Sequence, residues 1–308
     1  MSITRSIAAL LLLGSACSST ALACSDKDWK ACAGKPWVVG EMETPLGERW
    51  WPNKLWGAGD EAGSTNWYAR PEVVKRALAE ARIGKTYRLG RTGVEDATAQ
   101  TRFEGLGQLG VPTGGADANS TRLYNGLTRP QSDAAPGPKS NGLDKLHPIV
   151  ARGILIDLAG AKGVPFLEAG TEITLSDVRD ALARQGLAEL RLLPGDAVLF
   201  RTGWGVHARS DSARFSAGQP GIGIGVARWL SDDVQAGVVG SDTWGTEVAP
   251  PGDPACVRCV QRHLLVRHGI VMQHNLDLDA LAADKVWRFL YVSPVPVAGS
   301  VGSPIAVR

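Results

Sequence analysis

The sequence predicts a single α/β domain, and three observations lead to that fold class. Short apolar runs typical of buried strands alternate with segments whose apolar residues recur at helical spacing. Several of the predicted helices end at a glycine, and neither an internal repeat nor a linker divides the chain. With 308 residues, of which 44% are hydrophobic and 21% charged, the chain can bury a full core.

Residues 1–23 are predicted to form a secretory signal peptide. Arg5 supplies a positive charge, the stretch from Ile7 to Leu13 is apolar, and Ala21-Leu22-Ala23 is a small-x-small cleavage site. The apolar stretch is too short to span a bilayer, so no transmembrane helix is expected. We expect a periplasmic or secreted protein after cleavage near Ala23, with a lipoprotein anchored at Cys17 or Cys24 as the alternative.

Cleavage at Ala23 leaves four of the five cysteines: Cys24, Cys32, Cys256 and Cys259. An even number of cysteines in an oxidising compartment predicts disulfide bonds, whose pairing stays open among three connectivities. Zinc ligation by these cysteines is disfavoured, because neither the Cys24 to Cys32 spacing nor a partnering histidine supports it. A redox dithiol at Cys256 and Cys259 is a further alternative, but no thioredoxin-like strand precedes it.

Two segments before the α/β pattern are predicted to be irregular. Residues 24–69 form a tryptophan-rich arm held down by aromatic burial, and the α/β domain spans residues 70–308. Pro71 opens a helix whose apolar positions continue to Ala81, with Gly84 at its end. Residues 105–142 are dense in Gly, Pro, Asn, Ser and Thr, which predicts a long loop of the kind that often carries function.

The remaining chain alternates between predicted strands and helices. In order, these are a strand at Ile154–Ile156, a helix at Ser176–Gln185 closed by Gly186, a strand at Ala197–Phe200, a helix at Ile224–Leu230, a strand at Val238–Val239, a helix at Ala255–His268 closed by Gly269, a strand at Ile270–Met272 and an apolar segment at Val286–Val292. Short strands separated by helices favour a sheet with parallel strands.

Charge and motifs exclude several functions. The net charge is only +2 and basic residues are scattered, which argues against nucleic acid as a partner. The sequence contains no Gly-x-Ser-x-Gly elbow, no His-Glu-x-x-His motif, no phosphate-binding loop and no dinucleotide fingerprint after a strand. A small molecule is the expected partner.

Two polar, glycine-containing turns follow predicted strands, at residues 201–205 and 241–247. Ligands of open α/β sheets bind beyond the carboxyl ends of strands, and each turn carries a tryptophan, Trp204 or Trp244. We expect the two rings to line a pocket for a flat ligand. The alternative is that both rings only pack at strand ends.

Many short segments, in order along the mature chain, resemble the bacterial cyclase family, which includes kynurenine formamidase and isatin hydrolase. They are residues 56–63, Tyr124-Asn125-Gly126, residues 149–157, residues 201–205, Pro220-Gly221-Ile222-Gly223, residues 241–247 and Asn275-Leu276-Asp277-Leu278. The resemblance implies a swivelling β/β/α domain, a homo-oligomer, and metal-dependent opening of amides or cyclic amides.

The metal signature of that family is substituted in this chain. The signature is a His, then Gly-Thr-His, an Asp two residues later and another His four after that, with a further His and a Glu near the C-terminus. Laid on this sequence, these positions fall on Gln108, Gly110, Val111, Pro112, Gly114, Ala118, Gln261 and His274, although a small slip brings in His263. Pro, Gly and Ala side chains offer no donor atoms, so we expect no zinc or manganese cofactor.

Without a metal, catalysis requires acid–base residues with tuned pKa values. Our candidates are His274, Asp242 and Glu247. The alternative is that His274 caps a turn, Asp242 binds turn amides and Glu247 is a solvated surface acid. We expect Gln108, Tyr124, Trp204, Trp244 and Gln261 to contact the substrate, with loop anchoring as the alternative for Tyr124. His147, in the loop, is within reach of the pocket but has no evident partner.

Three hypotheses follow. In the first, the chain is an exported, metal-independent enzyme that hydrolyses or otherwise opens an aromatic or cyclic amide or lactone, or performs a lyase or cyclase step. In the second, it is a non-catalytic binding protein for a small aromatic ligand. In the third, a metal site is rebuilt from some of His147, His263 and His274, or from a three-dimensional cluster with Asp117 or Glu104, although no two histidines lie at i, i+4 spacing.

Overall fold

A computed structural model describes residues 53–91, 99–109, 111–112, 121–127, 141–254, 258–295 and 303–308, with backbone only at 111–112 and 121–122. The strands are β1 (Thr86–Arg88), β2 (Arg102–Glu104), β3 (Val111–Pro112), β4 (Thr121–Arg122), β5 (Ile149–Asp157), β6 (Glu172–Ile173), β7 (Ala197–Arg201), β8 (Gly221–Ile222), β9 (Val238–Ser241), β10 (Val271–His274), β11 (Arg288–Ser293) and β12 (Ile305–Val307). The α-helices are α1 (Pro71–Leu78), α3 (Leu158–Lys162), α4 (Leu175–Arg184), α5 (His207–Ser210), α6 (Ser212–Ala217), α7 (Ile224–Arg228), α8 (Cys259–Gln261) and α9 (Asp279–Ala283).

The described residues also contain other helical turns. The 3₁₀ turns are η2 (Gly63–Ala69), η5 (Tyr124–Gly126), η6 (Leu143–Lys145) and η7 (Trp204–Val206). Two π-helices, η8 (Trp229–Val234) and η9 (Arg262–Arg267), continue α7 and α8. No helix in the described part of the chain has the length and apolar character needed to cross a membrane.

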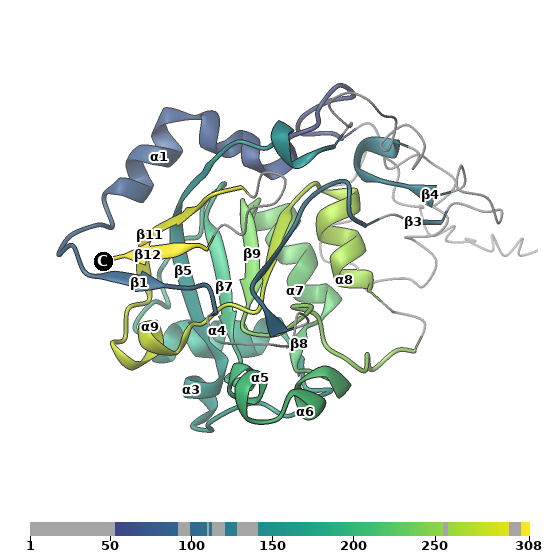
Figure 1. Cartoon of the computed structure of the whole chain (residues 1–308). Coiled ribbons are helices and arrows are strands. Elements are labelled where there is room, and N and C mark those ends of the chain that lie inside the picture. The colour runs from purple at the N-terminus through teal and green to yellow at the C-terminus, as the bar shows by residue number, and fades with distance from the viewer. Residues whose placement is uncertain are drawn as a thin grey trace, which may run out of the picture.

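An eight-stranded mixed sheet organises the molecule, in the order β1-β12-β11-β5-β7-β9-β10-β2 (Figure 1). Strands β5, β7, β9 and β10 are parallel, whereas β11 pairs antiparallel with β5 and β2 pairs antiparallel with β10. The carboxyl ends of the four parallel strands therefore lie along one edge of the sheet. This arrangement confirms the predicted α/β class.

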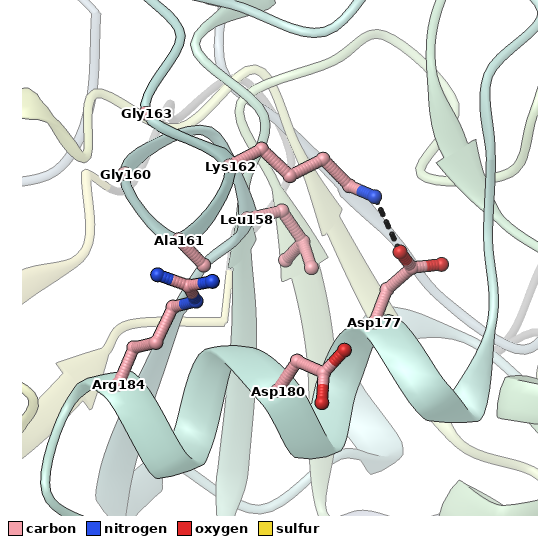
Figure 2. Close-up of a pocket in the computed structure, with 8 residues that line it drawn as sticks. All are labelled: Leu158, Gly160, Ala161, Lys162, Gly163, Asp177, Asp180 and Arg184. Carbon is pink, nitrogen blue, oxygen red and sulfur yellow. Dashed lines mark hydrogen bonds and ion pairs between the residues drawn. The ribbon is translucent and has the colours of Figure 1, made fainter.

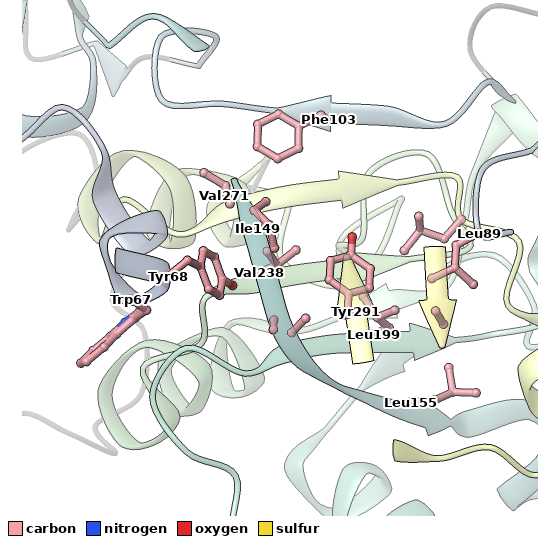
Figure 3. Packing of buried hydrophobic residues seen from close by; sticks show 14 of the residues in the cluster. Trp67, Tyr68, Leu89, Phe103, Ile149, Leu155, Leu199, Val238, Val271 and Tyr291 are labelled. Atoms are coloured by element: carbon pink, nitrogen blue, oxygen red, sulfur yellow. The ribbon is translucent and has the colours of Figure 1, made fainter. Parts of the chain in front are cut away.

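Alternate residues of the central strands face two hydrophobic cores. Leu155, Leu199 and Val238 point to the side covered by α1 and η2, together with Trp67 and Tyr68 (Figure 3). On the other side, the intervening strand residues pack against α4, α7 and η9. Because both faces of the parallel strands are buried, these strands read in sequence as continuous apolar runs.

The local signals of the sequence agree with the helix ends. Helix α4 begins with a capping box formed by Thr174 and Asp177, and Gly186 follows its end with φ +73°. Gly269 has φ +67° after η9, and the ring of Tyr124 leaves no room there for a side chain. The helix that begins at Pro71 ends at Leu78, three residues before the predicted position.

The predicted signal peptide, the predicted cleavage site and most of the tryptophan-rich arm lie outside the described residues, as do three of the four mature cysteines. The described end of the arm contains Trp56 and Trp67, whose rings meet edge to face at 5.0 Å. Trp67 is buried against the main core, as expected for an arm held by aromatic packing.

Candidate active site

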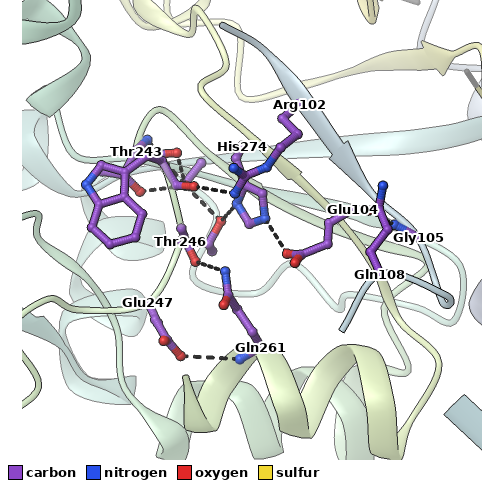
Figure 4. Close-up of polar contacts among 12 residues, drawn as sticks. Arg102, Glu104, Gly105, Gln108, Thr243, Thr246, Glu247, Gln261 and His274 are labelled. Carbon is purple, nitrogen blue, oxygen red and sulfur yellow. Dashed lines mark hydrogen bonds and ion pairs between the residues drawn. The ribbon is translucent and has the colours of Figure 1, made fainter. Parts of the chain in front are cut away.

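His274 is the last residue of β10 and lies at the carboxyl edge of the sheet. In the antiparallel register of β10 and β2, His274 is opposite Arg102, and Met272 is opposite Glu104. Side chains two residues apart on a strand share a face, so the diagonal pair His274 and Glu104 meets. The His274 Nε2 to Glu104 Oε2 distance is 2.8 Å, and the His274 side chain is fully buried (Figure 4).

A chain of hydroxyl groups continues from the other ring nitrogen. The His274 Nδ1 to Thr246 Oγ1 distance is 2.9 Å, the Thr246 to Ser241 distance is also 2.9 Å, and the Ser241 to Thr243 distance is 2.7 Å. An ionised Glu104 only accepts hydrogen bonds, so Nε2 of a neutral His274 carries the proton and Nδ1 accepts from Thr246. The direction of the hydrogen bond between Thr246 and His274 is thereby fixed.

The protonation states of this pair follow from burial and contact. Burial lowers the pKa of His274 more than the neighbouring carboxylate raises it, so the imidazole is neutral at pH 7. Burial by itself raises the pKa of Glu104. The hydrogen bond from His274 and the charges of Arg102 and Arg258 lower this pKa by more than burial raises it, so the net shift is downward. A neutral imidazole therefore faces an ionised carboxylate.

Glu247 lies in the turn after β9, at the beginning of α8. Its Oε2 accepts hydrogen bonds from the backbone N–H groups of Val260 at 3.0 Å and Gln261 at 3.3 Å. Burial raises the pKa of Glu247 to about 7, although these N–H groups and Arg258 oppose the shift. Glu247 is partly exposed, and its carboxyl group titrates near neutral pH, as a general acid or base requires.

Gln261 is buried beside Glu247. Its Nε2 donates to the carbonyl oxygen of Gly245 at 3.2 Å, which ties α8 to the turn after β9. Gln108 lies at the surface, where its Oε1 accepts from the Gly105 N–H at 2.8 Å. Gln108 and Gln261, which the sequence predicts to contact the substrate, thus belong to the group of polar residues drawn around Glu104 in Figure 4.

The carboxylate of Asp242 organises the turn after β7. Its Oδ1 accepts from the Thr202 N–H at 3.0 Å and from the Thr202 hydroxyl at 2.7 Å, and its Oδ2 accepts from the Gly203 N–H at 2.7 Å. This placement corresponds to the alternative in which Asp242 binds turn amides. Arg91 supports the same region, because its guanidinium donates to carbonyl oxygens of Gly205, Asp242 and Asn275.

The two tryptophans of the turns have different surroundings. Trp204 is only 1% exposed and packs in a small cluster with Phe166 and Phe215, which corresponds to the packing interpretation. Trp244 is partly exposed at the edge of this cluster, and its carbonyl oxygen accepts from Arg102 at 2.9 Å. The buried Nε1 of Trp244 has no hydrogen-bond partner among the described residues.

Tyr124 lies in the core at the opposite end of β10. Its hydroxyl donates to Asp60 Oδ2 at 2.7 Å, and its ring packs against Gly269. Burial and the neighbouring carboxylate raise the pKa of this phenol. Tyr124 therefore anchors its loop to the N-terminal segment, as in the alternative considered for it.

Glu104 belongs to the candidate site, although the sequence suggests it only as a member of a rebuilt metal cluster. A spacing signal was present. The Thr-His-x-Asp-x-x-x-His part of the family signature can also be laid ten residues earlier, on Thr101, Arg102, Glu104 and Gln108. In this register the threonine and the acidic residue are retained, and the two histidines are replaced by Arg102 and Gln108.

The i, i+4 rule also missed a pair of histidines. His263 and His268 are five residues apart, and the rings meet at 4.5 Å because η9 is a π-helix, in which the His268 N–H donates to the His263 carbonyl oxygen at 3.2 Å. Burial, with the charges of Arg267 and Lys54, lowers the pKa of His268 to about 3. His147 lies apart in a loop near Thr65.

A pocket of about 410 Å³ lies elsewhere, between α3 and α4 (Figure 2). Its polar lining consists of surface side chains, including Lys162 and Asp177, which form an ion pair at 2.5 Å. None of the predicted site residues lines it. We place the candidate site at Glu104, His274 and Glu247, because His274 binds a buried carboxylate and Glu247 titrates near pH 7.

Comparisons with known proteins agree on the fold. Residues 126–248 match the model of the Cyclase family. A crystal structure described as a novel cyclase is 23% identical, covers 82% of this chain and 96% of its own, and has a TM-score of 0.64. No curated protein matches the chain.

Two isatin hydrolase structures resemble the chain more weakly. Isatin hydrolase A from Ralstonia solanacearum is 18% identical, with 76% of this chain and 96% of its own covered and a TM-score of 0.46. Isatin hydrolase A from Labrenzia aggregata, bound to benzyl benzoate, is 16% identical, with 79% and 99% covered and a TM-score of 0.47.

Proposed function

We propose that this chain, whose residues 126–248 match the Cyclase family model, is an exported enzyme that opens a small aromatic or cyclic amide or lactone without a catalytic metal. The observation that carries this proposal is the buried pair of Glu104 and His274 in the same group of polar side chains as the titratable carboxyl group of Glu247 (Figure 4). The signal-peptide pattern of residues 1–23 supports export.

The residues at the signature positions do not fit a divalent ion. In the first register of the signature, Pro112 offers no side-chain donor, and the neighbouring signature positions Gly110, Gly114 and Ala118 lie outside the described residues. In the second register, Arg102 places a permanent positive charge where a ligand would be, and its guanidinium donates to the Trp244 carbonyl oxygen. Glu104 and His274, the two residues of this group best suited to bind a metal, bind each other at 2.8 Å instead. No step is therefore assigned to a metal.

Glu247 is the proposed general base and acid. A carboxyl group with a pKa of about 7 is ionised in a large fraction of molecules at neutral pH, and it is still strong enough as an acid to return the proton. We propose that the carboxylate takes a proton from water while the water oxygen bonds to the substrate carbonyl carbon. The carbonyl electron pair moves to its oxygen, and on collapse the leaving nitrogen or oxygen takes the proton from Glu247.

Trp244 and the Glu104–His274 pair support this step in different ways. The buried Nε1–H of Trp244 has no hydrogen-bond partner among the described residues, and we propose that it donates to the developing oxyanion once the substrate is bound. The partly exposed indole ring also suits a flat substrate. The negative charge of Glu104 raises the pKa of Glu247, and the hydrogen bond from His274 keeps that charge in place.

The test is turnover of a panel of cyclic aromatic amides and aryl lactones, including isatin, by untagged mature protein with and without a chelator. We expect hydrolysis that is insensitive to the chelator, and a loss in kcat of about 100-fold or more in Glu247→Gln. Glu168→Gln is the matched control, because Glu168 is exposed and forms an ion pair with the surface residue Arg214 at 2.8 Å.

Three other outcomes would point to a different function or mechanism. Product formation without incorporation of labelled oxygen from water would indicate a lyase or cyclase step, in which Glu247 transfers a proton to or from carbon. Binding of the panel compounds without turnover, unchanged in Glu247→Gln, would contradict an enzyme and leave a binding protein. Activity that is lost with chelator and restored by zinc would overturn metal independence.

A further inference from the structure

The amino end of β10 carries a second cluster of chemically active side chains, distant in the fold from His274. Asp232 comes from η8, His263 from η9, and His268 from the turn before β10. The candidate ligand atoms of these three residues all lie within 4.8 Å of one another. We propose that Asp232, His263 and His268 form a binding site for one Zn²⁺ ion that is separate from the proposed active site.

The donor set and its spacing suit zinc. Imidazole nitrogen and carboxylate oxygen both bind Zn²⁺ at about 2.0–2.2 Å, so two tetrahedral ligands lie roughly 3.4 Å apart. The candidate ligand atoms are up to 4.8 Å apart, and rotation of the Asp232 and His268 side chains, which are both partly exposed, would shorten these separations to about 3.4 Å. The fourth position remains open for water.

The π-helices bring these residues together. A π-turn places residues i and i+5 on one face, so His263 and His268 converge, and the His268 N–H bonds the His263 carbonyl oxygen at 3.2 Å. The adjoining π-helix η8 presents Asp232 beside them, and Ser231 joins the two helices through a contact of 3.0 Å to His263 Nε2. Short π-turns within helices occur frequently at functional sites.

Ser231 sets the tautomer of His263. The Ser231 hydroxyl donates to Asp232 Oδ1 at 2.8 Å or to the Arg228 carbonyl oxygen at 3.0 Å, and neither acceptor has a proton to return. The hydroxyl oxygen therefore accepts from His263 Nε2–H, which leaves the lone pair on Nδ1. A metal-binding histidine commonly donates its second N–H to such a neighbour.

The charges around the cluster are mixed. Arg228 and Arg267 act on His263 and Asp232 and oppose a cation, whereas Asp233 adds a second negative charge next to Asp232. We therefore expect binding to depend on coordination by the lone pairs of the ligands rather than on a general attraction of cations. This predicts selectivity for Zn²⁺ over Mg²⁺ and Ca²⁺, which prefer all-oxygen sites.

The experiment uses untagged mature protein stripped with a chelator, reloaded with ZnCl₂ and dialysed, with zinc per chain measured by elemental mass spectrometry and affinity by calorimetry. We expect one zinc per chain, and at least a tenfold weaker affinity in His268→Gln and in Asp232→Asn. His147→Gln and Asp180→Asn are the matched controls, because they remove the same residue types outside the proposed ligand set, and we expect affinities within twofold of wild type.

Cobalt substitution supplies a readout that is independent of stability. Visible absorption of Co²⁺ in a four-coordinate site is expected in the wild type and in both controls, and circular dichroism verifies that each variant is folded. The proposal is overturned if folded wild-type protein binds no stoichiometric zinc, or if His268→Gln and Asp232→Asn bind it as the wild type does. Loss of zinc in His274→Gln but not in His268→Gln would assign the ion to the active site and overturn this proposal together with metal independence.

Discussion

The two ends of strand β10 both carry histidine, but their surroundings differ. At the carboxyl end, His274 is fully buried, and its two ring nitrogens contact Glu104 and Thr246 at 2.8 and 2.9 Å. At the amino end, His263 and His268 lie ring to ring at 4.5 Å with Asp232 close by. Histidine is thus paired with a carboxylate through hydrogen bonds at one end of β10. At the other end, two histidines and an aspartate bring their possible metal-binding atoms close together.

The difference comes from what approaches each end. An edge strand, β2, supplies Glu104 beside His274, so a carboxylate takes the position next to the imidazole. At the amino end, two π-helices meet, and a second imidazole takes that position. An imidazole paired with a carboxylate has a defined proton location, whereas two neutral imidazoles and a carboxylate offer lone pairs to a shared ion.

The largest expected difference between the two ends is in stability. His274→Ala leaves the Glu104 carboxylate and the Thr246 hydroxyl without their shared partner and opens a cavity, so the free energy of unfolding should fall by about 3 kcal/mol. His268→Ala, at a partly exposed position, should cost about 1 kcal/mol or less. Urea unfolding measures both, and equal losses would contradict the contrast.

Asp242→Asn tests whether the carboxyl edge is held by its turns. The three hydrogen bonds from Thr202 and Gly203 to this carboxylate are buried, and an amide nitrogen in place of one oxygen faces a donor. We expect a loss of about 2 kcal/mol in unfolding free energy. Asp180→Asn, at an exposed position on α4, is the matched control and should change stability by less than about 0.5 kcal/mol.

Opposite pH dependences are expected at the two ends. Folding raises the pKa of Glu247 from 4.5 to about 7, so its contribution to stability is fully present below pH 4.5 and is lost as the pH rises to 7. Folding lowers the pKa of His268 from 6.5 to about 3, so stability at that end falls as the pH drops through this range.

Unfolding free energies measured from pH 4 to 8 separate these two contributions. The free energy of unfolding of wild type should fall by about 1 kcal/mol above pH 4.5 because of Glu247, and by about 1 kcal/mol below pH 6.5 because of His268, after screening by water. Glu247→Gln should abolish the first decrease, and His268→Gln the second. In the proposed enzyme, kcat/KM should also rise with pH to a plateau above about 7. A profile that is flat through pH 7 would exclude Glu247 as the base.

The smallest expected effect concerns Tyr124, near the amino end. Tyr124→Phe removes the donor to Asp60 but keeps the ring against Gly269, so we expect a loss of about 1 kcal/mol and unchanged turnover. Tyr87→Phe, which removes a hydrogen bond to the surface residue Asp284, is the matched control and should cost less. A large loss of turnover in Tyr124→Phe would instead place this hydroxyl at the substrate.

Much of the fold was predictable because its signals are local. The apolar runs that became β5, β7, β9 and β10, and the glycines that follow α4 and η9, reflect preferences of a few neighbouring residues. Gln261 and His274 became candidates because they fall on two positions of the metal signature of the resembling family, and Glu247 because it lies in a polar turn after a predicted strand. The pairing of Glu104 with His274 was not indicated, because it depends on the register of two strands 170 residues apart in sequence.

The sequence by itself thus determined the class of the fold and the residue types at the positions where the metal signature of the resembling family falls, since both are properties of residue identity and short spacing. Only the tertiary structure decided that Asp242, Trp204 and Tyr124 are occupied with packing and turn contacts. It also decided that His263 and His268 converge, because helix winding changed from 3.6 residues per turn to a π-turn. Burial, strand register and helix winding depend on the packing of the complete fold. They determine the pKa values and the hydrogen-bond partners of each histidine and carboxylate, so residues of the same type have different chemical properties.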